Sequence, residues 1–349
     1  MFGPSPLPRS LAAALRDAGA PRPHVRLGAV RDLARHAAPE GPRADRASAR
    51  ARLSEVLARD GDEAVRAEAA LALADARAED QLEPLCAALA DGSLRVRQLA
   101  VLALGELAVP GAAEVVEPLR ALLGHAEPSL RFQALLALGR LAPDVPLAVL
   151  AAALADPDAE VRWLALRLAD EHGLGGDERA LSRVERALAD PAPPVALAAA
   201  ILLARSGRVA AHPALIAAVA ASGARVPPDD LVAAIELCGE LGLSAATRAL
   251  ERHAFGRLGL GGSRFAWQAR IALARLGHER ARAHLVRGLD AWSRDARTHA
   301  AVAVGAAGIV EARPALERLA ADASRADADA VADALVALAR VAAARRAAG

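Results

Sequence analysis

Apolar positions along this chain recur in a short sequence pattern, called here the phrase, which returns every 31 to 40 residues. The phrase begins with an aliphatic residue that Arg usually follows, has Ala four positions later and ends in an Ala- and Leu-rich run. Ten starts can be traced, the later ones weaker: Val25, Val65, Val96, Leu130, Val161, Val195, Asp230, Phe265, Ala296 and Ala330. From Val65 onward the starts are 31 to 35 residues apart, whereas the first step of 40 contains an insertion. Such a period is typical of a repeat protein.

Each period predicts two amphipathic helices. Between Val65 and Val96 one helix ends near Ala76, and the next carries Leu82, Leu85 and Leu89 on a single face. Turns containing Asp or Gly, as at 90–93 and 156–158, separate the two helices of a pair and offer side chains that can cap the second helix. One pair cannot bury its apolar face alone, so the pattern predicts an all-α solenoid of about ten stacked helix pairs.

Composition supports helices over sheets. Hydrophobic residues make up 54% of the 349 residues, with four Phe, three Trp and no Tyr, whereas sheets favour aromatic and β-branched side chains. No stretch resembles a long linker, and a repeat array is not bound by the usual size of a domain. We therefore expect one solenoid over 1–349, divided into an N-terminal segment with the first helix (1–22), regular repeats (60–205), divergent repeats (206–341) and a tail (342–349).

Charge and cysteine content exclude several classes. The formal net charge of +1 argues against a protein that is polybasic or polyacidic overall. Cys86 and Cys238 are far apart and lack metal-ligand spacing, so they predict neither a disulfide framework nor a zinc site but two small core residues in a reducing compartment. The N-terminus lacks the apolar run of a signal peptide, and the longest uncharged stretch, 209–224, is too short to cross a bilayer. We expect a cytoplasmic protein.

An acid and an arginine recur at fixed places in the phrase. The Asp stands five positions before the aliphatic residue and the Arg directly after it, as in Asp60 with Arg66, Asp91 with Arg97, and Asp156 with Arg162. With these residues the chain resembles the HEAT-repeat superfamily, in particular the bacterial HEAT-like units of the phycobilisome lyase type, most clearly over residues 60–200. The resemblance implies a right-handed α-α superhelix along which Asp and Arg form a hydrogen-bonded ladder. His125 replaces the Asp in the fourth unit, and Ala196 replaces the Arg in the sixth.

No motif in the chain predicts catalysis. Neither a phosphate-binding loop with its Lys nor an HExxH pair occurs, and the glycine-rich segment 256–263 reads as a loop inside a widened helix pair. HEAT-like di-iron hydroxylases use several His-Glu pairs, whereas this chain has only one, His278-Glu279. For a bilin or cofactor lyase we find neither a reactive Cys nor a suitable acid cluster. We expect no catalytic residue, no cofactor and no metal, and hence no enzyme.

The resemblance places the second helix of each pair on the concave side, where a partner would bind. Position +2 after the aliphatic start should point away from the core, and it holds Phe132, Trp163, Leu197 and Trp267. Exposed aromatic residues are enriched at interfaces, although each could instead pack over the neighbouring repeat. Position +6 is regularly aliphatic and is predicted to serve mainly packing between repeats: Leu71, Leu102, Leu136, Ile201, Ile271 and Val302.

Basic residues gather in the segment 248–297, which holds eleven Arg against four acidic residues and also four aromatic ones. Arginines interleaved with aromatics suit a phosphate-bearing or acidic partner. The alternative is a solvated array whose arginines pair with acids of neighbouring repeats. If the segment binds a partner, the expected contacts are Arg264, Arg270, Arg280, Arg282 and Arg287, with Trp267 as a stacking residue.

Our leading hypothesis is a monomeric, non-enzymatic scaffold that holds a helix or an extended segment of a partner protein or peptide along its concave face. The alternative is nucleic-acid binding, specifically of DNA, through 248–297, either by simple binding or as a relative of the HEAT-like DNA glycosylases. Asp170, on the helix of Trp163, is the nearest counterpart of their catalytic Asp. The near-zero net charge and the confinement of the basic excess to one segment count against this alternative.

Overall fold

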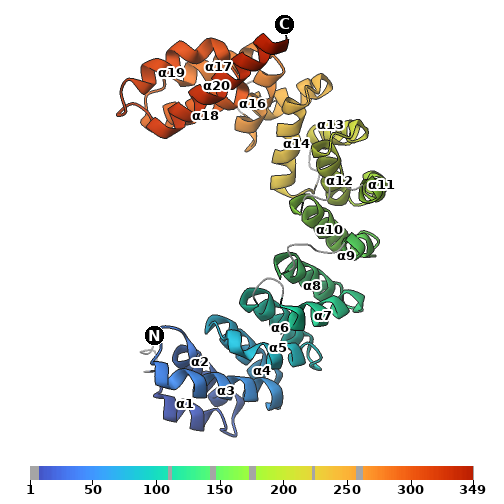
Figure 1. The fold of residues 1–349 in the computed structure, drawn as a ribbon, viewed down its shortest axis with the longest axis vertical. Helices are drawn as coiled ribbons and strands as arrows, with labels where there is room; N and C mark the ends of the chain where they lie inside the picture. Colours follow the sequence, from blue (N-terminus) through green and yellow to red (C-terminus); the bar gives the residue numbers. More distant parts are fainter. Residues whose placement is uncertain are drawn as a thin grey trace. The chain divides into compact units, whose positions relative to one another are not determined.

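The computed structural model describes residues 8–108, 112–141, 147–172, 178–221, 225–256 and 262–348, and all regular structure in these ranges is helical (Figure 1). Twenty α-helices lie there, in alternation of a first and a second helix, with short 3-10 turns before or after several first helices. This confirms the predicted all-α class and the ten helix pairs. The chain forms two compact units, residues 1–174 and 175–349, which are described separately below. The expected single solenoid stays a prediction.

The helices of the first unit are α1 (Leu11–Asp17), α2 (Pro23–Ala37), α3 (Arg43–Arg59), α4 (Glu63–Asp75), α5 (Leu82–Ala88), α6 (Leu94–Leu107), α7 (Ala113–Ala121), α8 (Pro128–Leu141), α9 (Leu147–Ala153) and α10 (Ala159–Glu171). Those of the second unit are α11 (Glu178–Arg186), α12 (Pro193–Arg205), α13 (His212–Ala220), α14 (Pro228–Glu240), α15 (Thr247–Phe255), α16 (Ala266–Arg275), α17 (Glu279–Gly288), α18 (Arg294–Ala307), α19 (Arg313–Ala320) and α20 (Ala328–Ala348).

Every start of the repeated phrase lies at the beginning of an even-numbered helix. Val65, for example, is the third residue of α4, and Phe265 directly precedes α16. The Ala four positions after each start is buried at all ten places, where a larger side chain would keep the neighbouring helices apart. The recurring Ala is therefore the residue that allows successive second helices to pack closely.

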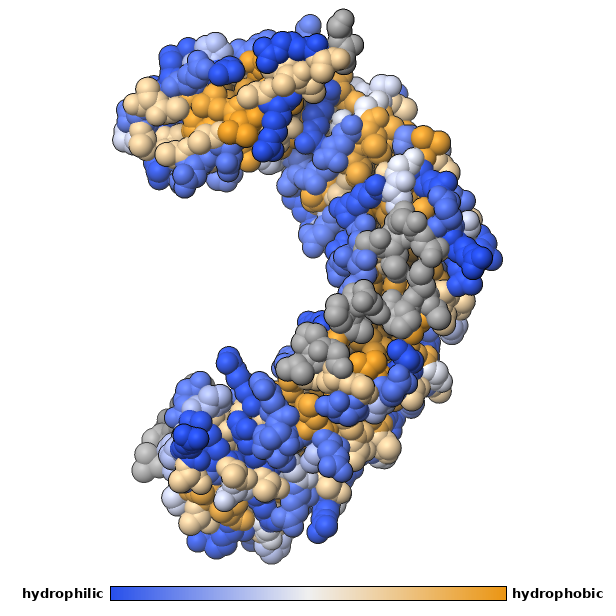
Figure 2. Space-filling view, viewed as in Figure 1, coloured by the Kyte–Doolittle hydropathy of each residue, from blue (hydrophilic) through white to orange (hydrophobic). Residues whose placement is uncertain are grey.

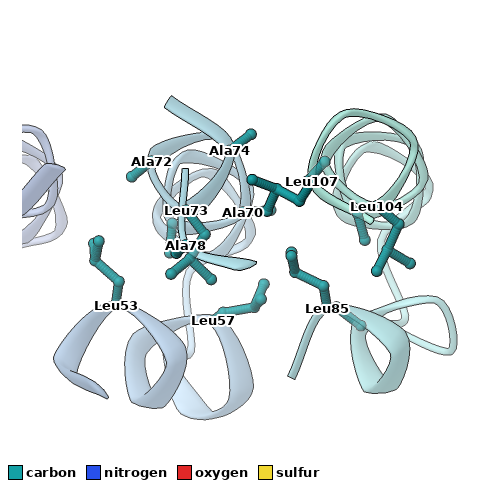
Figure 3. Close-up of a cluster of buried hydrophobic side chains, with 14 of the residues drawn as sticks. Leu53, Leu57, Ala70, Ala72, Leu73, Ala74, Ala78, Leu85, Leu104 and Leu107 are labelled. Atoms are coloured by element: carbon teal, nitrogen blue, oxygen red, sulfur yellow. The ribbon is translucent and has the colours of Figure 1, made fainter. Parts of the chain in front are cut away.

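Leucines of the first helices fill the space beneath the second helices. In the close-up of Figure 3, Leu53 and Leu57 of α3 and Leu85 of α5 point toward α4 and α6, where they meet Leu73 and Leu104. Each of these five side chains is at most 1% exposed. Full burial of one leucine contributes about 1.5 to 3 kcal/mol to stability. The cluster to which they belong extends from Ala14 to Leu141, so neighbouring repeats of the first unit share one core.

In the C-terminal half, the last helix differs from expectation, and one predicted loop lies largely outside the described residues. The last helix, α20, continues to Ala348, so the separate tail predicted after residue 341 is wrong. Its Ala- and Arg-rich end, 342–348, has high helix propensity and no breaker. The predicted glycine-rich loop falls largely on residues 257–261, outside the described ranges. No helix within those ranges is both long and apolar enough to span a membrane.

Candidate functional site

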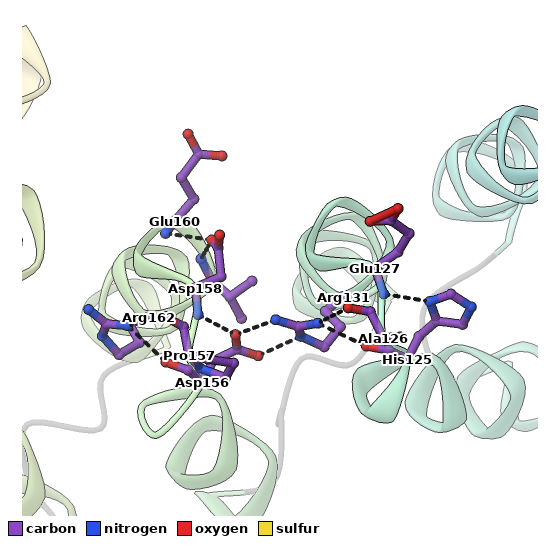
Figure 4. A network of polar contacts seen from close by, with 10 residues as sticks. His125, Ala126, Glu127, Arg131, Asp156, Pro157, Asp158, Glu160 and Arg162 are labelled. Atoms are coloured by element: carbon purple, nitrogen blue, oxygen red, sulfur yellow. Dashed lines mark hydrogen bonds and ion pairs between the residues drawn. The ribbon is translucent and has the colours of Figure 1, made fainter.

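A ladder of arginines and aspartates joins successive repeats. Three arginines on second helices each donate from Nε and Nη2 to both carboxylate oxygens of the Asp that precedes the next second helix, at 2.7 to 2.8 Å: Arg26 to Asp60, Arg66 to Asp91 and Arg131 to Asp156. Figure 4 shows the Arg131 rung, in which Nη1 also donates to the carbonyl of His125 in its own turn, at 2.9 Å. The expected structural ladder is confirmed at these three rungs.

The rungs hold their carboxylates ionised. Hydrogen bonds from Arg66 lower the pKa of Asp91, burial raises it by less, and the backbone N–H of Ser93 lowers it further. At Asp60 and Asp156 burial is the largest influence and raises the pKa, but the Arg26 and Arg131 hydrogen bonds and the nearby charges outweigh it. Each pair is thus a charge-assisted, bidentate contact in a partly buried place, where such contacts are strongest.

At His125 the turn is kept but the ladder has no carboxylate to accept an arginine. The ring Nδ1 of His125 accepts the backbone N–H of Glu127 at 2.9 Å, just as the Asp91 carboxylate accepts that of Ser93 at 2.8 Å, so the histidine preserves the turn. A neutral imidazole cannot accept two hydrogen bonds from a guanidinium. Arg97, whose rung would end at this position, has a buried Nε with no hydrogen-bond partner among the described residues.

The aromatic series at position +2 is only partly exposed. Phe132, Trp163 and Trp267 are half-buried, whereas Leu197 is 2% exposed, so the expectation that Leu197 faces solvent is wrong. Its helix α12 is buried on every side from Leu197 to Ala204, because it packs against α11, α13 and α14. The Trp267 ring lies edge-on to His299 of α18, with centroids 6.2 Å apart, so it packs over the next repeat as the alternative interpretation held.

Position +6 carries more exposed apolar surface than +2. Leu102 is 42% exposed and Val302 49%, so the prediction that they serve mainly inter-repeat packing is wrong; Val336, the equivalent residue of α20, is 50% exposed. Leu71, Leu136 and Ile271 are half-buried and Ile201 is buried. Residues four apart share a face of a helix, so positions +2 and +6 form one surface, called here the second-helix face. This spacing of four residues was the signal that could have identified Leu102 and Val302 as exposed residues of that face.

The second-helix face is hollowed between α2 and α4. An open depression of about 330 Å³ is lined by Arg31 and Leu71, the two +6 residues, and by Glu68, which accepts a 2.6 Å hydrogen bond from Arg31 Nε. Figure 2 shows hydrophilic residues beside apolar areas on the visible side of the chain. On the second-helix face, Leu102 and Val302 are exposed apolar residues, and Arg31 and Glu68 supply polar groups at the depression.

Several arginines of the basic segment are engaged within the protein. Arg275 pairs with Glu240 at 2.8 Å, Arg282 with Glu311 at 2.7 Å, and Arg294 with Asp327 at 3.8 Å. In each pair the acid belongs to an adjacent repeat. At these positions the alternative interpretation, a solvated array with arginines paired to neighbouring acids, describes the structure. Trp292, which precedes α18, is 96% exposed and was not among the expected contacts.

Another group of cations surrounds a single phenyl ring. The guanidinium carbon of Arg280 lies 4.1 Å from the centroid of Phe255 and that of Arg270 lies 5.6 Å from it, while the ring of His284 meets the same phenyl group edge-on at 6.4 Å. Arg287 stands one turn after His284 on α17. We call these five residues the Phe255 cluster. Phe255 itself is buried.

Like charges dominate the electrostatics of this cluster. Burial, and then the charge of Arg280, lowers the pKa of Arg270. Burial, followed by the charges of Arg270, Arg287 and Arg280, lowers the pKa of His284, so that its neutral form is favoured at pH 7. Crowded cations lower one another's pKa because each disfavours the charged form of its neighbour.

The structure therefore brings together only some of the expected contacts. Arg270 and Arg280 meet at Phe255, and Arg287 acts on the same group through its charge near His284. In contrast, Arg282 is ion-paired and Arg264 lies over Phe265, at 4.7 Å. Trp267 lies on the second-helix face of α16, and Phe132 and Trp163 belong to the other unit.

Neither cysteine is activated as a nucleophile. Both cysteines are free thiols; burial raises the pKa of Cys238 to about 12, and burial with the charge of Glu114 raises that of Cys86. A thiol with a raised pKa is a poor nucleophile. Within the described ranges, no three His, Cys, Asp or Glu residues lie together as metal ligands would.

Solved structures of several kinds resemble the chain. An engineered protein is 18% identical with a TM-score of 0.48, over 95% of this chain and 98% of its own. YibA of Escherichia coli is 17% identical with a TM-score of 0.55, over 78% of this chain and 93% of its own. The complex of CpcE and CpcF of phycocyanin lyase from Nostoc is 18% identical with a TM-score of 0.39, over 72% and 96%. At 17% identity the likeness to YibA concerns the fold alone.

Sequence comparison identifies the repeats of the first unit. Curated protein sequences contain no match. The family model described as HEAT repeats matches residues 8–105 and 82–170, which lie within the first unit. The matched segments contain the Arg–Asp ladder and the paired helices described above, and the same helix pairs continue in the second unit. Residues 8–170 of the chain are therefore HEAT repeats.

Proposed function

We propose that this protein is a non-enzymatic scaffold that binds a helix or extended segment of a partner protein along the second-helix face, the face expected to be concave in HEAT repeats. The observation that carries the proposal is the recurrence of exposed aliphatic residues at +6, with Leu102 in the first unit and Val302 and Val336 in the second. A side chain at the same place in successive repeats offers evenly spaced contacts to a long ligand.

The chemistry of the face favours an amphipathic partner. Leu102 and Leu136 would receive apolar side chains, next to the half-buried Phe132, while Arg31 and Glu68 around the depression between α2 and α4 offer polar groups of both signs. Apolar anchors within a polar rim are the usual anatomy of an interface. Leu197 is not part of this proposal because it is buried.

A peptide library tests the proposal without a known partner. Random peptides displayed on phage are selected on the purified chain and then measured against Leu102→Asp and Leu136→Asp. We expect selected amphipathic peptides whose dissociation constant rises at least tenfold in either variant, about 1.4 kcal/mol. Glu117→Ala, on the exposed side of the first helix α7, is the matched control and should change binding little. Selected peptides that bind all of these proteins equally would contradict the proposal.

Nucleic-acid binding lacks a comparable observation. A duplex would need arginines available along a continuous track, and Arg275, Arg282 and Arg294 are instead paired with Glu240, Glu311 and Asp327. We therefore keep the protein scaffold as the proposed function.

A further inference from the structure

Two acidic side chains stand beside the leucines of the second-helix face without a partner. Asp75 of α4 and Glu106 of α6 lie one helical turn after Leu71 and Leu102, at position +10 of the phrase. Both side chains are exposed, and neither carboxylate forms a hydrogen bond or an ion pair with any residue in the described ranges. We call Asp75 and Glu106 the acidic edge.

Acids at the same position in other repeats are paired with an arginine. Glu240, at +10 of α14, forms an ion pair with Arg275 at 2.8 Å. Glu171, at +10 of α10, lies 3.7 Å from Arg167 of its own helix. The acidic edge differs from these two acids because, within the described ranges, no cation is paired with it.

The acidic edge also stands where an acid is unfavourable. Asp75 is the last residue of α4, and Glu106 lies one residue before the end of α6. The carbonyl groups at the end of a helix carry partial negative charge, which repels acids and attracts cations. Neither last turn contains a basic residue that would offset this repulsion. Folding alone therefore disfavours both acids, whereas a cation supplied by a ligand would be attracted by the carboxylate and by the helix end together.

A depression next to Asp75 has room for a side chain of a ligand. This depression of about 330 Å³ between α2 and α4 is lined by Asp75 together with Arg31, Arg35 and Glu68. Arg31 is paired with Glu68 at 2.6 Å, and Arg35 is paired with Asp32. Among these lining residues, Asp75 is therefore the charge that the described part of the chain leaves unpaired.

We infer that the partner segment held by the first unit carries basic side chains opposite the acidic edge and apolar ones opposite Leu71 and Leu102. This inference rests on the proposed function and names the chemistry of its ligand. Neighbouring second helices pack about 8 to 10 Å apart, so contacts on α4 and α6 fall about three residues apart in an extended segment and about six in a helical one. An exposed arginine, Arg140, holds +10 on α8, so the basic residues are confined to the part of the ligand over α4 and α6.

Two synthetic helical peptides test the inference. They have the same length and the same leucine positions, and their polar positions are all lysine in one and all glutamate in the other. Fluorescence anisotropy at low ionic strength measures their affinity for the full chain. We expect the leucine–lysine peptide to bind with a dissociation constant of about 10 to 100 µM, and the leucine–glutamate peptide to bind about tenfold more weakly. The preference should shrink at high salt, which screens exposed charges.

Charge reversal locates the preference on the acidic edge. In the double variant Asp75→Lys with Glu106→Lys the preference should invert, so that the leucine–glutamate peptide binds more tightly. The matched control is Glu83→Lys with Glu114→Lys, two exposed acids on the first helices α5 and α7, which changes the net charge equally and should keep the preference of the parent protein. Thermal unfolding checks that both double variants fold.

The inference is overturned if the leucine–lysine peptide does not bind, if both peptides bind the parent protein equally, if the preference survives reversal of the acidic edge, or if the control inverts it as well. Leu102→Ser distinguishes such a failure from a failure of the scaffold proposal. Peptides that bind equally to the parent protein and both lose affinity in Leu102→Ser would show that the apolar row binds ligands without selection by the acidic edge. If neither peptide binds, the phage selection still tests the scaffold.

Discussion

Arg66 donates from Nε and Nη2 to the two carboxylate oxygens of Asp91, at 2.7 and 2.8 Å, and so joins helix α4 to the turn before α6. The same carboxylate accepts the backbone N–H of Ser93 at 2.8 Å, and Arg66 Nη1 donates to the carbonyl of Asp60 at 2.8 Å. Two turns and two repeats thus depend on one ion pair.

Replacing Asp91 by Ala should destabilise the first unit by about 2 to 3 kcal/mol, because the partly buried Arg66 loses its anion and Ser93 loses its acceptor. Urea unfolding measures the loss, and hydrogen exchange should show it concentrated in α4 and α6. Glu106→Ala, an exposed acid on α6, is the control and should stay within about 0.5 kcal/mol of the parent protein. Equal effects of the two changes would contradict a structural role for the rung.

Acid should weaken the ladder. The pKa values of Asp60, Asp91 and Asp156 are lowered in the folded protein, so their contribution to stability is complete above the ordinary value near 3.8 and is lost as pH falls through the folded values. The difference in unfolding free energy between the parent and Asp91→Asn should therefore be constant near neutral pH and shrink below about pH 4. Urea titrations across this range check it; a difference that persists unchanged in strong acid would exclude the carboxylate charge as its cause.

Restoring the missing rung should stabilise the protein. In His125→Asp the new carboxylate keeps the acceptor for the N–H of Glu127 and offers an anion to the buried, unpartnered Nε of Arg97, for a gain of about 1 to 2 kcal/mol. His125→Asn preserves the turn without the charge and is the matched control. If the Asp variant unfolds at the same urea concentration as the Asn variant, Arg97 does not reach this position.

The repeat itself could be predicted because its cause is local. The helix starts follow from the aliphatic residue and the Ala four positions later, which is buried in every repeat, and the ladder follows from the spacing of residues such as Asp60 and Arg66. Both signals are fixed by contacts between neighbouring repeats, so one period of sequence contains nearly all the information.

The exposure of individual side chains and the ion pairs of individual arginines could not be predicted in the same way. Leu197 has the same place in its phrase as Phe132, yet it is buried because α12 is covered on every side. Arg282 and Arg280 differ by two residues on one helix, but only the structure shows that Arg282 reaches Glu311 while Arg280 lies over Phe255. These outcomes depend on residues about thirty positions away, whose side-chain directions a sequence pattern does not specify.

The two thiols should differ in reactivity. Cys238 is completely buried with a pKa of about 12, whereas Cys86 is half-buried and its pKa is raised by burial and by Glu114. Since the thiolate is the reactive form, iodoacetamide near pH 8 should label Cys86 slowly and Cys238 hardly at all. Mass spectrometry follows each peptide with time, and labelling in urea, where both should react alike, is the control. Equally fast labelling of both in the folded protein would mean that α14 opens readily.

Close packing between second helices should make Gly239 irreplaceable. A Cβ at Gly239 of α14 would lie 2.6 Å from the Cα of Ala272 in α16, closer than two carbons can approach, and the obstacle is backbone that cannot rotate away. Gly239→Ala gains about 1 kcal/mol of helix propensity, but overpacking costs about 1 to 3 kcal/mol, so we expect a net loss of stability. Gly92→Ala, where no atom lies within 4 Å of the new Cβ, is the matched control and should be close to neutral. Thermal unfolding of the two variants compares them directly, and a Gly239→Ala protein as stable as its parent would show that α14 and α16 can separate without loss.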